Sequence, residues 1–114
     1  WLPQQVRILS HVVKTTGKEP PIIDARDALE DPVGMLSALC ACLEIEYMDE
    51  MVSWDPGPRD CDGIWAKHWY ASVWKSAGFS PYTPREGQLS PEHDSVLKEA
   101  IPLYDEMWSR RLGA

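Results

Sequence analysis

The part of the sequence best equipped for chemistry runs from Trp54 to Phe79, where aromatic and basic side chains alternate. It holds four of the six tryptophans in the chain. An aromatic face beside a cation can clamp an adenine ring, and a guanidinium or ammonium group can bind a phosphate. Alternatively, Trp65 and Trp69, one helical turn apart, dock a helix on a neighbouring sheet. The candidate ligand-binding residues of this segment are Arg59, Lys67, Trp65 and His68.

His68 is the side chain in this segment best suited to proton transfer, because imidazole titrates near neutral pH. The alternative is an exposed histidine, or one that forms only local hydrogen bonds. Ser53, Ser72 and Ser76 lack the glycine-flanked strand-to-helix turn that exposes a nucleophilic serine. We therefore assign no catalytic residue from the sequence.

Carboxylates gather directly after the most apolar extended run. They are Asp24, Asp27, Glu30 and Asp31. Ligands of open α/β sheets bind at the carboxyl ends of strands, which would make Asp24 or Asp27 face a ligand. The alternative makes these residues helix caps and a solvated connector, and Asp31 before Pro32 is a strong capping signal.

The common nucleotide motifs are absent from this sequence. Gly17-Lys18 is followed by Glu19, and no glycine precedes it at the offset that a phosphate-binding loop requires. There is also no G-x-G-x-x-G motif. These residues alone therefore predict no recognisable nucleotide cradle.

Charge and cysteine content narrow the possible partners. The net charge of −7 argues against nucleic acid and against an anionic membrane surface. No apolar run approaches the roughly 20 residues that span a bilayer. Cys40, Cys42 and Cys61 show no metal-binding spacing with each other or with the histidines. We expect reduced thiols in a cytoplasmic protein, with no metal.

Residues 21–25 (P-I-I-D-A) are the one stretch that reads as a β-strand. A single strand leaves its backbone N–H and C=O groups without partners, which is costly when they are buried. The partners would come from a missing N-terminal half or from other copies of the chain. The start at Trp1 instead of Met agrees with processing or truncation. We therefore expect residues 1–114 to be the C-terminal part of a single α/β domain.

Helical periodicity accounts for most of the remaining sequence. The apolar spacing predicts helices over residues 2–16, from 32 to about 43, and over 64–76. Ser90-Pro91-Glu92 signals the start of a last helix, in which Pro102 should cause a kink. Strand, acidic connector and apolar helix at 21–43 look like half of a β-α-β unit.

Several of these segments together resemble the sulfotransferase family. Residues 21–32 (P-I-I-D-A-R-D-A-L-E-D-P) resemble its late strand and D-L-x-x-D-P turn, and Leu43-Glu44-Ile45 resembles the end of the helix that follows. Residues 54–58, 62–70 (D-G-I-W-A-K-H-W-Y) and 76–79 are similar to one subgroup, sometimes named branched-chain aminotransferase-like. The likeness spans about residues 2–82, and the block at 62–70 is its most specific part.

The resemblance implies a P-loop-type three-layer fold with a parallel sheet, of which this chain is the C-terminal half. It also implies 3′-phosphoadenosine 5′-phosphosulfate as the sulfuryl donor and a small alcohol or amine as the acceptor. Well-studied members hold the donor's 3′-phosphate partly through a late basic, glycine-containing loop. Arg59 to Lys67 falls in a comparable place. The family's donor loop and usual catalytic base lie in the half that is not present here.

Three hypotheses follow for the whole protein. The first is a sulfotransferase to which Arg59 or Lys67 contributes donor binding. The second is a catalytically inactive binding or interaction module of the same fold. The third is a pyridoxal-phosphate aminotransferase, which would require a Schiff-base lysine beside a phosphate cup. No lysine of this chain has that sequence context, so the third hypothesis ranks last.

Overall fold

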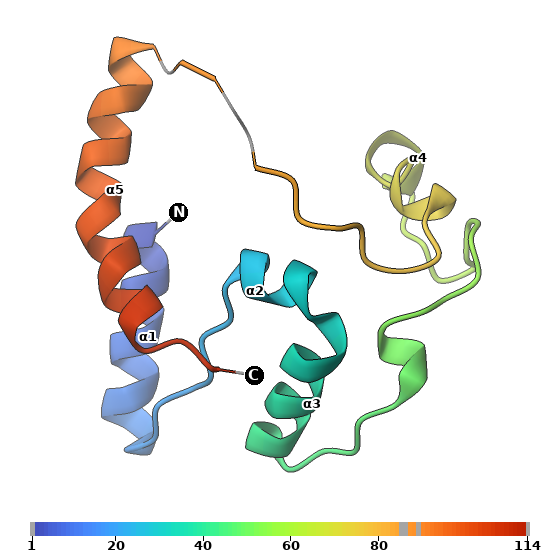
Figure 1. Cartoon of the computed structure of the whole chain (residues 1–114), viewed down its shortest axis with the longest axis horizontal. Helices are drawn as coiled ribbons and strands as arrows, with labels where there is room; N and C mark the ends of the chain where they lie inside the picture. Colours follow the sequence, from blue (N-terminus) through green and yellow to red (C-terminus); the bar gives the residue numbers. More distant parts are fainter. Residues whose placement is uncertain (1, 85–86, 89, 114) are drawn as a thin grey trace. The chain divides into compact units, whose positions relative to one another are not determined.

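The computed structural model describes residues 2–84, 87–88 and 90–113, and these residues are mostly helical (Figure 1). The longer helices are α1 (Leu2–Thr16), α2 (Ala25–Glu30), α3 (Pro32–Leu43) and α5 (Pro91–Ser109). The shorter ones are α4 (Ala66–Trp69) and the 3₁₀ turns η1 (Asp49–Met51) and η2 (Val73–Lys75). The chain forms two compact units, one of residues 1–25 with 83–113 and one of residues 26–82.

In the first unit, α1 packs against α5 (Figure 1). Leu9 of α1 is buried. Ser90 caps α5 by accepting a hydrogen bond from the His93 amide, and Pro91 occupies the first turn, where its missing N–H costs nothing. Both predicted helix starts, at Leu2 and Pro91, are confirmed. α5 continues as one helix through Pro102, the residue at which the sequence predicted a kink.

The end of α5 is tied to the segment before α2. The Leu112 amide donates to the Ile22 carbonyl at 2.8 Å, and the Tyr104 hydroxyl donates to the Asp24 carboxylate at 2.8 Å. Arg110 forms an ion pair with Glu19 at 2.5 Å. Residues 104–112, which include the end of α5 and the segment after it, therefore hold residues 19–24 in place through polar contacts.

The predicted strand at residues 21–25 is not formed in the described part of the chain. Residues 19–24 have no regular secondary structure, and Ala25 already belongs to α2. A strand requires a neighbouring strand, and here the Ile22 carbonyl binds the chain's own C-terminal segment instead. The α/β sheet expected from the sequence is thus not confirmed, because no described residue belongs to a strand.

In the second unit, α3 begins as predicted. The Asp31 carboxylate accepts a hydrogen bond from the Gly34 amide at 2.9 Å, and Pro32 is the first helical residue. Met35 and Cys40 of α3 and Ala66 of α4 are the buried apolar residues among the described residues of this unit, and the Cys40 sulfur lies 3.7 Å from the Met51 sulfur. These contacts form the small core of this unit.

The helix predicted over residues 64–76 is wrong in extent. It is replaced by the single helical turn α4, a turn at residues 71–72 and the 3₁₀ turn η2. Aromatic and β-branched residues are weak helix formers. In addition, the Trp74 carbonyl and indole N–H both bind the preceding loop. Trp74 therefore forms contacts with the loop and does not continue the helix.

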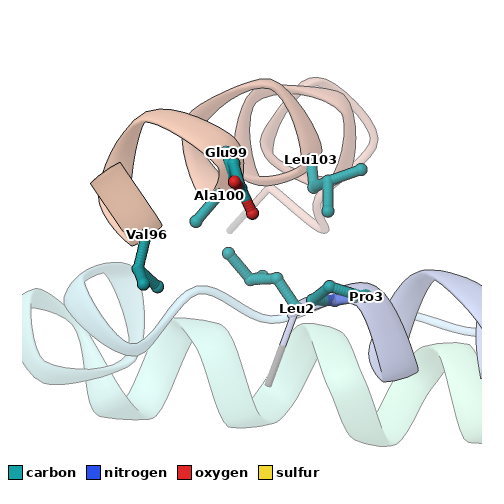
Figure 2. Close-up of a pocket in the computed structure, with 6 residues that line it drawn as sticks. All are labelled: Leu2, Pro3, Val96, Glu99, Ala100 and Leu103. Atoms are coloured by element: carbon teal, nitrogen blue, oxygen red, sulfur yellow. The ribbon is translucent and has the colours of Figure 1, made fainter. Parts of the chain in front are cut away.

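An apolar groove of about 210 Å³ lies between α1 and α5 within the first unit (Figure 2). Leu2 and Pro3 of α1 line one wall, and Val96, Ala100 and Leu103 of α5 line the other. Glu99 contributes a carboxylate to the lining. None of the candidate binding residues lies on this groove, because all four belong to the second unit.

Candidate functional site

Residues 54–79, called here the tryptophan loop, begin and end next to each other in the second unit. Ser53 and Gly78 form an isolated antiparallel bridge, and the Trp54 amide donates to the Ala77 carbonyl at 3.2 Å. A Cβ on Gly78 would lie 2.9 Å from the Val52 carbonyl oxygen, so a glycine is needed for this close approach. Backbone contacts therefore hold the two ends of the loop together.

Asp62 organises the middle of the tryptophan loop. One of its carboxylate oxygens accepts from the Arg59 amide at 2.9 Å and from the Trp74 indole N–H at 2.8 Å. The hydrogen bond from the Arg59 amide, followed by the bond from Trp74 and the charge of Arg59, lowers the pKa of Asp62. The ionised carboxylate thus holds the Arg59 turn against Trp74.

Arg59 is exposed and lies on the turn that Asp62 closes. Its guanidinium group donates one hydrogen bond, at 3.3 Å, to the backbone carbonyl of Asp55. It forms no ion pair with a carboxylate among the described residues. A guanidinium anchored in this way keeps donors available for an anion.

Lys67 and His68 lie on α4, and both side chains are exposed. Neither side chain has a hydrogen-bond or ion-pair partner in the described part of the chain. For His68, the structure thus agrees with exposure and shows no partner for proton transfer.

Trp65 immediately precedes α4, and its indole is 58% exposed. The ring folds back over Gly63, where an added Cβ would meet ring carbons at 2.6 Å. Gly63 therefore makes room for the indole. The sequence-predicted residues Arg59, Lys67, Trp65 and His68 all lie in one loop on exposed positions, with Arg59 on the Asp62 turn and the other three at α4.

The four tryptophans of the loop divide into two pairs. Trp54 and Trp74 are half-buried and hydrogen-bonded, to Ser76 at 3.1 Å and to Asp62 at 2.8 Å, respectively. Trp65 and Trp69 are exposed, Trp69 by 77%. Structural packing explains the first pair. Nothing in the described structure covers the second pair, which is therefore available to a ligand or a partner.

The carboxylates after residue 23 do not converge on a site. Asp24 accepts a hydrogen bond from Tyr104, and Asp31 caps α3 as predicted. Glu30 forms an ion pair with Arg26 at 2.7 Å. Asp27 lies in the first turn of α2. Asp31 is thus explained by its role as a helix cap, and Glu30 by its ion pair on the helix that connects to α3.

Sequence reasoning missed Asp62, which shapes the loop. The available signal was Asp60-Cys61-Asp62-Gly63, because aspartate and glycine are typical of tight turns. The partner Trp74, twelve residues further on, had no comparable signal.

Within the described ranges, no group of three or more histidine, cysteine or acidic side chains is arranged to hold a metal ion. No helix among these residues is long and apolar enough to cross a membrane. The expectation of no metal rests on the sequence and stays a prediction.

Comparison with known proteins identifies the family. Residues 15–111 match the sulfotransferase domain family. The chain is 38% identical over 89 residues to branched-chain-amino-acid aminotransferase-like protein 2 of Arabidopsis thaliana, and 42% identical over 91 residues to protein 1 of the same name and organism. Each match covers 78% of this chain but 16% of the relative, so the chain spans about a sixth of their length. No solved structure matches significantly. The extent of the family match shows that the chain belongs to the sulfotransferase domain family.

Proposed function

We propose that the chain is the C-terminal portion of a sulfotransferase-like domain, and that the tryptophan loop binds 3′-phosphoadenosine 5′-phosphosulfate. The observation that supports this most is that one loop exposes Arg59, on the turn held by Asp62, and also Lys67, His68 and Trp65, at α4. Two cations and an exposed aromatic face match the phosphates and adenine of this donor.

In the proposed reaction, the hydroxyl or amine of a small acceptor attacks the sulfur of the donor. The new bond joins the acceptor's oxygen or nitrogen to sulfur, while the bond from sulfur to the phosphate oxygen breaks. Adenosine 3′,5′-bisphosphate leaves, and the acceptor loses a proton. Arg59 and Lys67 would bind the donor's phosphates, so this chain contributes binding and positioning. We assign no proton acceptor to its residues.

The segment at residues 19–24, which has no regular secondary structure here, supports a further part of this proposal. We propose that it joins a parallel P-loop-type sheet supplied by the rest of the protein or by other copies. The segment is apolar at Ile22 and Ile23, and Ile23 is exposed in the described structure. An extended apolar run of this kind is typical of a strand once a partner strand is present.

Calorimetry tests the proposed donor site in the full-length protein. We expect Arg59→Ala and Lys67→Ala each to weaken binding of adenosine 3′,5′-bisphosphate by about tenfold, because each removes a charge-assisted contact to a phosphate. Lys98→Ala is the matched control, since Lys98 pairs with Asp94 on α5. Unchanged affinity in both loop variants would remove these residues from the site.

The inactive-module alternative makes a different prediction in the same protein. Such a module would bind the nucleotide, or a partner, without releasing adenosine 3′,5′-bisphosphate from the donor. Turnover of the sulfuryl donor in the presence of an acceptor mixture therefore separates the enzyme from the module.

A further inference from the structure

A cavity lies at the base of the tryptophan loop, beside the paired segments 53–54 and 77–78. It is wide open to solvent, its volume is about 540 Å³, and it is contained in the second unit. Its lining consists of Glu50, Ser53, Trp54, Asp55 and Ala77. The cavity differs from the proposed donor site, because none of Arg59, Lys67, Trp65 and His68 lines it.

Trp54 lines this cavity, and its indole is held by two contacts. Its indole N–H donates to the Ser76 hydroxyl at 3.1 Å, and that hydroxyl in turn donates to the Val73 carbonyl at 2.7 Å. Phe79 meets the Trp54 ring edge-on, with 5.7 Å between ring centroids and 75° between planes. Two independent contacts therefore restrain the indole, so its orientation does not have to be set when a ligand binds.

The charges around the cavity favour a cation. Glu50 and Asp55 both line it, and neither carboxylate forms an ion pair with a described residue. No lysine or arginine is among the lining residues. Arg59 approaches Asp55 only through its backbone carbonyl. Two acidic side chains do not make the group of three or more ligands expected for a bound metal ion, and no such group exists in the described ranges.

We propose that this cavity binds an organic ammonium group, with the Trp54 ring as its aromatic wall and Glu50 and Asp55 as counter-charges. An ammonium group over a tryptophan face is attracted by the ring quadrupole, and nearby carboxylates add to that attraction. Ala77, whose backbone pairs with that of Trp54, contributes only a methyl group to the lining, which leaves room for a bulky methylated ammonium.

This proposal deepens the proposed function and depends on it in one respect. If the protein transfers a sulfuryl group, the ammonium end anchors the acceptor while a hydroxyl of the same molecule receives the sulfuryl group. The hydrogen bond between the Arg59 guanidinium and the Asp55 carbonyl, 3.3 Å long, ties a proposed donor-binding residue to a residue of the cavity. Donor and acceptor would then be bound side by side.

The test uses choline and its neutral isostere 3,3-dimethylbutan-1-ol as probes, titrated into the full-length protein by calorimetry. The two molecules share shape and hydroxyl group and differ in charge. We expect choline to bind at least about fivefold more tightly than the isostere, in line with a cation held by an aromatic ring. Equal affinity, or no binding of choline, overturns the proposal.

Substitutions of lining residues test whether choline binds in this cavity. Glu50→Gln and Asp55→Asn should each weaken choline binding severalfold, and Ala77→Leu should also weaken it by narrowing the cavity. Asp60→Asn is the matched control, because this exposed carboxylate lies outside the lining. Near-ultraviolet circular dichroism verifies folding, and if Ala77→Leu does not fold, the two carboxylate variants decide. Choline binding that survives both of them contradicts the assignment.

A parallel titration with adenosine 3′,5′-bisphosphate separates the two proposals. Nucleotide binding without choline binding overturns the ammonium cavity and leaves the donor site. Choline binding without nucleotide binding supports the cavity and contradicts the proposed function.

Discussion

Replacing Gly78 by alanine tests the way in which the tryptophan loop is closed. The new Cβ would lie 2.9 Å from the carbonyl oxygen of Val52, and real Cβ atoms essentially never approach another atom below 3.0 Å. That oxygen belongs to the backbone, so no side-chain rotation can relieve the contact. The bridge between Ser53 and Gly78 must therefore shift or open.

The expected cost follows from two opposing effects. Overpacking of this kind destabilises a folded segment by about 1–3 kcal/mol. Alanine also restricts the unfolded chain more than glycine does, which stabilises the folded protein by about 0.4–1 kcal/mol. The free energy that keeps the loop closed should therefore decrease by about 1–2 kcal/mol. At 25 °C this corresponds to an opening equilibrium raised roughly 5- to 30-fold.

Native-state hydrogen exchange measures this opening directly. The Trp54 amide donates to the Ala77 carbonyl at 3.2 Å, so its exchange should accelerate by that factor in Gly78→Ala. The Leu112 amide, which belongs to the other unit, should be unaffected. Gly87→Ala is the matched control, because its Cβ would meet nothing within 4 Å. If the Trp54 amide exchanges equally slowly in both variants, the close approach at Gly78 does not constrain the loop.

Three further predictions concern the core, the loop and a helix cap. Met35→Ala should lower the free energy of unfolding by about 2–5 kcal/mol in chemical denaturation, because Met35 is 1% exposed, whereas the volume-conserving Met35→Leu should cost less than about 1.5 kcal/mol. The folded-state pKa of Asp62 lies below the ordinary 3.8, so its contribution is present above that pH and is lost as the pH falls through the lowered value. Asp62→Asn should therefore flatten the acid dependence of the intrinsic tryptophan fluorescence, to which Trp74 contributes, and an unchanged acid profile would contradict the role of this carboxylate. Ser90→Ala should destabilise α5 by about 1 kcal/mol in thermal unfolding, and Ser95→Ala, inside the same helix, should have a smaller effect.

The helix boundaries that the sequence predicted correctly are those with local signals. Asp31-Pro32 and Ser90-Pro91 combine a capping side chain with a proline in the first turn, and both helices begin there. Gly17, with φ of +68°, follows α1 as expected for a residue past a helix end. These signals act within a few residues, so they can be read without knowing the tertiary structure.

Elements that depend on distant partners could not be predicted in the same way. Residues 21–25 have the composition of a strand, but the Ile22 carbonyl binds Leu112, ninety residues away. The helix expected over 64–76 has aromatic residues at helical spacing, yet Trp74 is drawn to Asp62. Hydrophobic periodicity contains no information about either contact.

The candidate site itself stays a prediction, although its residues can be located in the structure. The composition of the tryptophan loop pointed to Arg59, Lys67, Trp65 and His68, and the structure places all four on exposed positions of that loop. The support of the Arg59 turn by Asp62 and the cavity at Trp54 depend on contacts across the loop, which residue types alone do not reveal.

Photolabelling tests the central claim, that the tryptophan loop binds the donor nucleotide, most directly. The full-length protein would be irradiated with 8-azidoadenosine 3′,5′-bisphosphate and digested with trypsin, which cleaves after Arg59 and Lys67. We predict that the label lies on the peptide of residues 60–67, which contains Trp65, and that unmodified nucleotide competes it away. Competable labelling found only outside residues 54–79 would contradict this account.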